Sequence, residues 1–174
     1  MAVFIALLRA VNVGGTGSLK MDHLRRLCAR EGFEGATTYI QSGNVVFKSR
    51  LAEQKVKAAL ERVLTKTLGK PAGVLVREAS ELSAALARNP FPDALPQQVL
   101  MFFLDEAPPA TALRGLTIPG REKVELRGRE LFIHFPDGQG ESKLKIPIAK
   151  TGTGRNLNTV RKLVAMADAL QNAR

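Results

Sequence analysis

The pattern of hydrophobic and polar positions over the first 78 residues predicts a strand and then a helix. The continuous apolar run Val3–Leu8 is typical of a strand that is buried on both faces. A polar, glycine-containing loop follows it over residues 12–18. Apolar residues then recur every three or four positions, as in an amphipathic helix, at Met21, Leu24, Leu27 and Cys28. Gly32 is expected to end that helix.

Two short strands and a second helix are predicted next. Residues 36–40 and 45–48 flank the tetrapeptide Gln41-Ser42-Gly43-Asn44, whose composition indicates a hairpin turn. A helix is expected over residues 52–68, because its apolar positions have helical spacing, and residues 73–77 form a fourth strand. The order strand, helix, strand, strand, helix, strand is that of a ferredoxin-like, or split βαβ, unit.

The remaining residues repeat much of this order. A strand is predicted over residues 98–104, a short helix over 109–115, and a hairpin from 123–127 and 130–135. The last helix has a clear apolar stripe at Leu157, Val160, Leu163, Val164, Ala167 and Leu170. A final strand is not evident in this part of the sequence, and the two halves share no residue-level similarity.

The fold class predicted is therefore α+β, with two ferredoxin-like halves and a C-terminal helix. The first half is expected over residues 1–78, and the second half with its C-terminal helix over 97–174. Between them, residues 79–96 are predicted to form a helix and a connection that contains Pro90, Pro92 and Pro96.

Composition points to a cytoplasmic protein with a packed core. Hydrophobic residues make up 45% of the 174 residues, which is enough to bury a core. No apolar run approaches the roughly 20 residues that cross a membrane, and the first residues lack the basic region of a signal peptide. The single cysteine, Cys28, excludes an internal disulfide and fits a reducing compartment. The sequence does not indicate an oligomeric state.

The net charge of +10 admits two interpretations. A basic protein attracts polyanions such as nucleic acids, nucleotides or phosphorylated metabolites. The same charge can simply keep a protein soluble. Residues 140–174 contain seven Lys and Arg but two acidic residues, so this segment carries half of the excess.

Two polar segments of the first half could bind an anion. Residues 12–18 contain Gly14, Gly15 and Gly17 just before a helix, a setting in which backbone N–H groups can line an anion site. Their spacing matches neither the dinucleotide fingerprint nor the P-loop, so a flexible connection explains it equally well. The turn at residues 41–44 can likewise recognise a ligand or merely satisfy its own backbone.

A third polar segment, residues 151–159, precedes the last helix. Asn156 or Asn158 is a good N-cap there, which would explain the segment structurally. In the functional interpretation, Arg155 beside a helix N-terminus makes a bidentate contact with a phosphate or carboxylate.

Three stretches, LLRAVNVGG, TYIQSGNVVF and TGRNLNTVRKL, occur here in the order in which they occur in the bacterial family called domain of unknown function 1697. The chain resembles that family over nearly its whole length. The resemblance implies a duplicated ferredoxin-like fold and a family without an established activity. This chain has Leu157 where the family usually has tryptophan, a departure that would alter binding if the indole contacts a ligand.

The polar residues that match the family's signature are our candidate ligand-binding set, expected to form one polar pocket. They are Arg9, Asn12, Gly14, Gly15, Gln41, Ser42, Asn44, Arg155, Asn156, Asn158 and Thr159.

Other kinds of chemistry find little support in the sequence. Neither His23 nor His134 has a cysteine or carboxylate at ligand spacing, so no metal site is expected, and no cofactor is predicted. There is no nucleophile elbow, and Cys28 falls on the apolar face of its helix.

The predicted function is binding of a small anionic ligand that resembles a phosphate or a nucleotide. The alternatives are sequence-independent nucleic-acid binding by a basic surface, an enzyme that acts on a phosphorylated substrate, and an interaction module. No membrane partner is expected.

Overall fold

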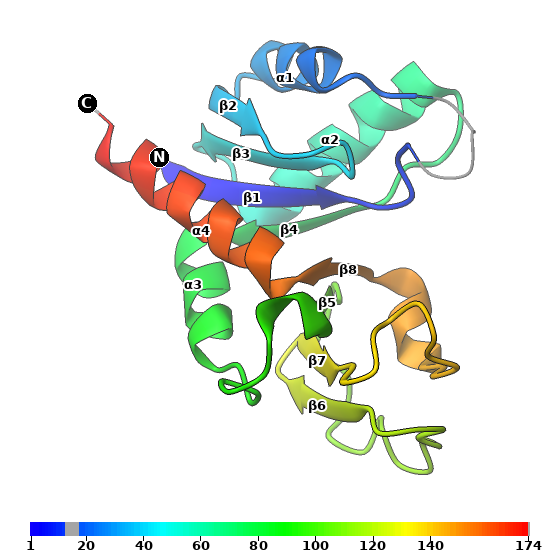
Figure 1. The fold of residues 1–174 in the computed structure, drawn as a ribbon. Helices are drawn as coiled ribbons and strands as arrows, with labels where there is room; N and C mark the ends of the chain where they lie inside the picture. The colour runs from blue at the N-terminus through cyan, green and yellow to red at the C-terminus, as the bar shows by residue number, and fades with distance from the viewer. Residues whose placement is uncertain (13–17, 174) are drawn as a thin grey trace. The chain divides into compact units, whose positions relative to one another are not determined.

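The computed structural model describes residues 1–12 and 18–173 (Figure 1). The first 78 residues form the six elements predicted from the hydrophobic pattern, in the predicted order. They are β1 (Ala2–Leu8), α1 (Met21–Arg30), β2 (Glu34–Thr38), β3 (Asn44–Ser49), α2 (Glu53–Leu68) and β4 (Val74–Glu78).

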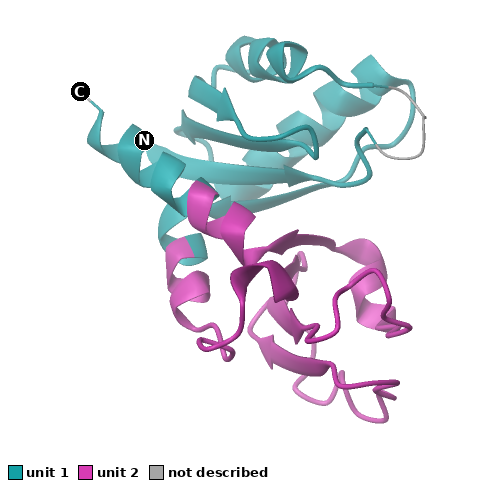
Figure 2. Ribbon diagram, in the orientation of Figure 1, with its two compact units in different colours: residues 1–82, 163–174 teal, residues 83–162 magenta. Residues whose placement is uncertain are grey.

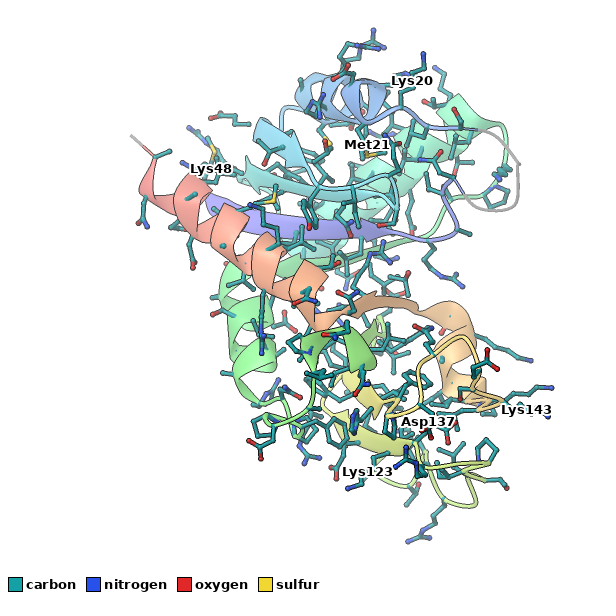
Figure 3. All side chains as sticks on the ribbon, in the orientation of Figure 1. Lys20, Met21, Lys48, Lys123, Asp137 and Lys143 are labelled. Carbon is teal, nitrogen blue, oxygen red and sulfur yellow. The ribbon has the colours of Figure 1, made fainter. Side chains whose placement is uncertain are left out.

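The first sheet has the strand order β2-β3-β1-β4, and all its strand pairs are antiparallel. The central strand β1 is buried from Val3 to Leu8, as its continuous apolar run predicts. Helices α1 and α2 lie on one face of this sheet (Figure 1). Their buried residues share one core with Phe4 and Phe47 of the sheet. Met21 begins α1 and points toward that core, while its neighbour Lys20 is exposed (Figure 3).

The rest of the chain forms a second four-stranded antiparallel sheet. After α3 (Ala79–Ala87) come the 3-10 helix η1 (Pro96–Gln98) and strands β5 (Val99–Phe103), β6 (Lys123–Arg127) and β7 (Glu130–His134). The 3-10 helix η2 (Pro147–Thr151), β8 (Thr153–Asn156) and α4 (Leu157–Asn172) complete the chain. The sheet order β6-β7-β5-β8 repeats that of the first sheet, strand for strand. The structure thus confirms an α+β fold with two ferredoxin-like halves and a C-terminal helix.

The fourth strand of the second sheet, β8, is the one that the sequence does not make evident. It is four residues long and consists of Thr, Gly, Arg and Asn, so it has neither an apolar run nor an alternating pattern. Gly152, which precedes β8, must be a glycine because its backbone lies very close to β5. A Cβ on Gly152 would lie 2.3 Å from the carbonyl oxygen of Phe103.

The short helix predicted over residues 109–115 is wrong, because this segment is a series of turns. Its hydrogen bonds join residues three apart, as in the bond from Ala112 N–H to the carbonyl of Pro109 (2.9 Å). The preceding Pro108 restricts the backbone on one side, and Gly115 has a φ of +73° on the other. Between β5 and β6 the described chain therefore has no α-helix that corresponds to α1.

The chain divides into two compact units (Figure 2). The first unit contains residues 1–82 and 163–174, and the second contains residues 83–162. Within the first unit, Leu170 of α4 packs against Gly35 of β2. A Cβ placed on Gly35 would lie 2.8 Å from Cδ1 of Leu170. The division into two halves that meet at residues 79–96, which the sequence predicts, stays a prediction. None of the helices in the described part of the chain is long and apolar enough to cross a membrane.

Candidate functional site

The candidate residues fall into two groups, one in each unit. Arg9, Asn12, Gln41, Ser42 and Asn44 belong to the first unit. The second unit contains Arg155, Asn156, Asn158 and Thr159. The remaining two candidates, Gly14 and Gly15, lie outside the described residues. One pocket shared by all of these residues stays a prediction.

Asn12 joins two segments that are far apart in the sequence. Its side-chain nitrogen donates hydrogen bonds to the carbonyl oxygens of Leu19 (3.0 Å) and Gln41 (2.8 Å). Its side-chain oxygen accepts a bond from Leu19 N–H at 2.7 Å. One amide group therefore fixes the start of α1 to the 41–44 turn, beside the end of β1.

The 41–44 turn is held against β1 by backbone and side-chain bonds. Leu8 N–H donates to the carbonyl of Gly43 at 2.8 Å. Gly43 has a φ of +86°, and a Cβ there would lie 2.9 Å from Leu8 Cβ, so this position requires glycine. The fully buried Asn44 side chain donates to the carbonyl of Tyr39 (2.8 Å) and to Ser42 Oγ (3.0 Å). Asn44 therefore shapes the turn, while Gln41 and Ser42 are exposed.

Backbone strain is concentrated in these same loops. Among the described residues, the non-glycine residues with positive φ are Ala10 (+51°), Asn12 (+60°) and Ile40 (+52°). For a β-branched residue such as Ile40 this conformation is an outlier, and its side chain is also exposed. Residues held in sparsely populated conformations tend to occur at functional sites. The end of β1 is therefore the candidate region of the first unit that we consider further.

Arg9 follows β1 directly and is positioned by Gly73. Its N–H donates to the carbonyl of Gly73 at 2.9 Å. The Arg9 side chain lies across Gly73, since a Cβ there would come within 3.1 Å of Arg9 Cδ and 3.4 Å of its terminal nitrogen. The missing side chain of Gly73 thus leaves space for the half-buried Arg9.

A groove of about 710 Å³ opens beside Arg9. Its other lining residues are Glu61, Arg62, Thr65 and Lys66 of α2 and residues 71–73, which precede β4. The basic lining residues are Arg9, Arg62 and Lys66, and Glu61 is the acidic one. The volume lies in the range of small-molecule binding sites.

Neighbouring groups compensate the charge of Glu61. Lys57 Nζ lies 2.6 Å from Glu61 Oε1 and also donates to the carbonyl of Val74 at 2.6 Å. Val74 N–H donates to the same carboxylate oxygen at 3.1 Å. Lys57 pairs with Glu61 and Glu31 pairs with Arg62, so each of these two lining charges is shared with a neighbour.

Arg155 lies inside β8 and is buried, with 8% of its surface exposed. Its guanidinium donates to Thr153 Oγ1 at 2.8 Å and to the carbonyl of Gly154 at 3.0 Å. Burial lowers the pKa of the Arg155 guanidinium to about 10. A buried arginine is unusual, because burial removes its charge from water. Arg155 therefore remains a candidate.

The other candidates of the second unit surround the start of α4. Asn156 Oδ1 accepts a hydrogen bond from the N–H of Thr159 at 3.0 Å, which makes Asn156 the N-cap residue. Asn158 is exposed on the first turn, and Thr159 is buried. The capping interpretation of this segment is therefore correct for Asn156, and a ligand role for it would have to coexist with the cap.

The second unit has a cavity of its own, of about 310 Å³, that the candidate residues do not line. Asp137 and Lys143 belong to its lining (Figure 3). Ser142 Oγ donates to Glu122 Oε1 at 2.6 Å, and this bond lowers the pKa of the Glu122 carboxyl. Arg121 donates two hydrogen bonds to Asp137 and lowers its pKa. Glu122 and Asp137 are thus hydrogen-bonded between the segment before β6 and the segment after β7.

The sequence did not single out Arg62, Thr65, Lys66 or Gly73. A usable signal did exist, because Arg62 and Lys66 are four residues apart and so share one face of the helix. That this face lies beside Arg9 follows from the topology. β4 runs antiparallel to β1, and Val74 pairs with Leu8, so α2 must end where β1 ends.

These features define an α+β protein of two four-stranded sheets with a cationic groove at the end of its first strand. The chain belongs to the family described as "Protein of unknown function (DUF1697)", which matches residues 1–132. The match covers the LLRAVNVGG and TYIQSGNVVF stretches, and the TGRNLNTVRKL stretch lies beyond it.

A solved structure with the same fold is that of the conserved bacterial protein SP0830 from Streptococcus pneumoniae. It is 22% identical to this chain, with a TM-score of 0.80, and the likeness covers 95% of this chain and 98% of that chain. At this identity the likeness shows the fold alone. No curated protein matches the chain significantly.

Proposed function

We propose that this protein binds a small anionic ligand, similar to a phosphate or a nucleotide, at the C-terminal end of β1. The observation that carries the proposal is the position of Arg9. Its side chain lines a groove with two further cations, beside three strained loop residues. Arginine presents several N–H donors in a planar group that matches phosphate and carboxylate oxygens.

The other candidates of the first unit have different roles in this proposal. Asn12 holds the loops in place through its three hydrogen bonds. Gln41 and Ser42 are exposed at the turn and can offer uncharged donors and acceptors to the ligand. The site proposed here is built from the first unit alone, and a ligand role for Arg155, Asn156, Asn158 and Thr159 of the second unit stays a separate prediction. The lone, buried Cys28 supports a location in the reducing cytoplasm.

The test is calorimetric titration of the intact chain with inorganic phosphate and with a sugar phosphate. We expect Arg9→Gln to weaken binding by roughly tenfold or more, because it removes a charge-assisted contact. Arg50→Gln is the matched control. It removes the same charge from an exposed position that follows β3, at the opposite end of the first sheet.

Arg9→Lys separates a site from a general charge effect. It keeps the charge but loses the planar donor group, and so should restore part of the affinity. Equal affinity in Arg9→Gln, Arg50→Gln and the unchanged protein would contradict the proposal.

A further inference from the structure

We infer that the ligand carries several linked anionic groups, as an oligophosphate does, and that it is recognised without contacts that read a nucleotide base. This inference rests on the proposed binding at Arg9. It adds a second anion subsite on α2, formed by Lys66 and Arg62 with the hydroxyl of Thr65.

The position of the cations on α2 is the first argument. Arg62 and Lys66 lie one helical turn apart, separated by about 6 Å along the axis, and both line the groove that Arg9 also lines. A single phosphate at Arg9 does not need a row of cations along a helix. A chain of phosphates that extends from Arg9 along α2 would meet them in succession.

The state of each α2 side chain is the second argument. Arg62 pairs with Glu31 at 2.7 Å; the side chain of Arg62 is 70% exposed, whereas that of Glu31 is 19% exposed. Arginine has five N–H donors, so a multiply charged ligand can contact the exposed guanidinium beside Glu31. Thr65 Oγ1 accepts a bond from Ala72 N–H at 3.3 Å, and a hydroxyl that accepts can also donate its own hydrogen. Lys66 is exposed on the same face.

The residues that line the groove are the third argument. None of its eight lining residues, all within the described part of the chain, is aromatic, and Pro71, Ala72 and Gly73 are among them. Proteins that hold nucleotide bases commonly stack them on aromatic rings. The volume of about 710 Å³ is larger than one phosphate requires. The groove therefore suits an extended anion whose charge, rather than its base, is recognised.

The experiment compares orthophosphate, pyrophosphate, tripolyphosphate, ATP and CTP by calorimetry with the full chain at constant pH and ionic strength. We expect affinity to rise by about tenfold or more from orthophosphate to tripolyphosphate, since each added phosphate gains a charged contact. ATP and CTP should agree within about threefold, because stacking, which would separate them, is absent.

Two single-charge variants locate the second subsite. Lys66→Gln should weaken tripolyphosphate binding by a clearly larger factor than orthophosphate binding, because only the longer anion contacts Lys66 directly. Lys55→Gln is the matched control, because Lys55 is an exposed lysine of the same helix, about 16 Å away along the axis, and does not line the groove.

The outcomes separate this inference from the proposed function. If Arg9→Gln weakens every probe but Lys66→Gln behaves like Lys55→Gln, the second subsite is wrong and the site at Arg9 stands. If Arg9→Gln changes no probe, the proposed function fails and the inference with it. A preference of about tenfold or more for one nucleotide over the other would overturn recognition without base contacts.

Discussion

Cys28 lies on the face of α1 that packs into the core of the first unit, and its surface is fully buried. Burial raises the pKa of its thiol to about 12 from an ordinary value of 9.0. The thiolate is the reactive form, so native Cys28 should resist alkylation at neutral pH. Its packing role, expected from the apolar stripe, agrees with this environment.

The raised pKa of Cys28 predicts how stability depends on pH. Above pH 9.0 the unfolded chain releases the thiol proton, whereas the folded chain keeps it until about pH 12. At this thiol the folded state then binds more protons, so the contribution of Cys28 to the free energy of unfolding falls as pH rises across this interval. The thiol adds at most about 1.4 kcal/mol of loss per pH unit. Urea unfolding at several pH values measures it.

Cys28→Ala is the control for the pH dependence. It removes the thiol, and it lowers stability at every pH because it leaves a small cavity. The informative quantity is the slope against pH, which should be shallower in Cys28→Ala than in the unchanged protein above pH 9.0. Identical slopes would show that the buried thiol does not contribute.

The candidate site shows which residues a sequence can reveal at this scale. Arg9 and Asn12 stood out because they belong to the LLRAVNVGG stretch, which resembles the family's signature. Lys66 did not stand out, because an exposed lysine on a helix is ordinary. Lys66 is a candidate because it lines the same groove as Arg9, and this placement depends on how β4 pairs with β1.

At the scale of elements, the sequence left two residues, Asn156 and Asn158, as possible caps of the last helix. The structure assigns the cap to Asn156 through its bond with the N–H of Thr159. Asn156→Ala should therefore reduce the free energy of unfolding by about 1 kcal/mol. Chemical unfolding with two-state analysis measures the change.

Asn158→Ala is the matched control for the cap, because it makes the same substitution two residues later at an exposed position. Alanine favours the helix, so Asn158→Ala should leave stability unchanged or raise it slightly. A loss in Asn158→Ala as large as that in Asn156→Ala would contradict the assignment of the cap.

Elements with a strong apolar pattern were predicted, and elements without one were not. β1 and α1 have runs or stripes of apolar residues that continue into the core. The final strand β8 consists of polar residues and glycine, and it exists because it pairs with β5 at the edge of a sheet. That pairing is a tertiary contact, which no local pattern encodes. The opposite error occurred at residues 109–115, where a helix was predicted and the structure has turns.

At the scale of the whole molecule, the two sheets share one strand order although their connections differ. α1 and α2 link the strands of the first sheet, whereas turns and the 3-10 helix η2 occupy the corresponding places in the second. The order of strands can be preserved when the connections change, because pairing within a sheet depends on the strands themselves. A duplicated architecture is therefore visible in topology where sequence similarity between the halves is absent.

The net charge of +10 belongs to the whole molecule as well, because basic residues exceed acidic ones in both units. This charge should produce weak binding to nucleic acid of any sequence. Binding that releases counterions falls steeply with salt, by roughly 40-fold from about 50 to about 200 mM for three contacts with duplex phosphates. Fluorescence polarisation with labelled oligonucleotides measures this dependence.

The same measurement separates a diffuse surface from the groove. If charge alone attracts the nucleic acid, Lys55→Gln and Lys66→Gln should weaken binding equally, since each removes one positive charge from the same helix. A selective loss in Lys66→Gln would instead mean that the phosphate backbone enters the groove beside Arg9. Absence of binding at low salt would exclude the nucleic-acid alternative, because attraction between the net charge and the phosphates is strongest there.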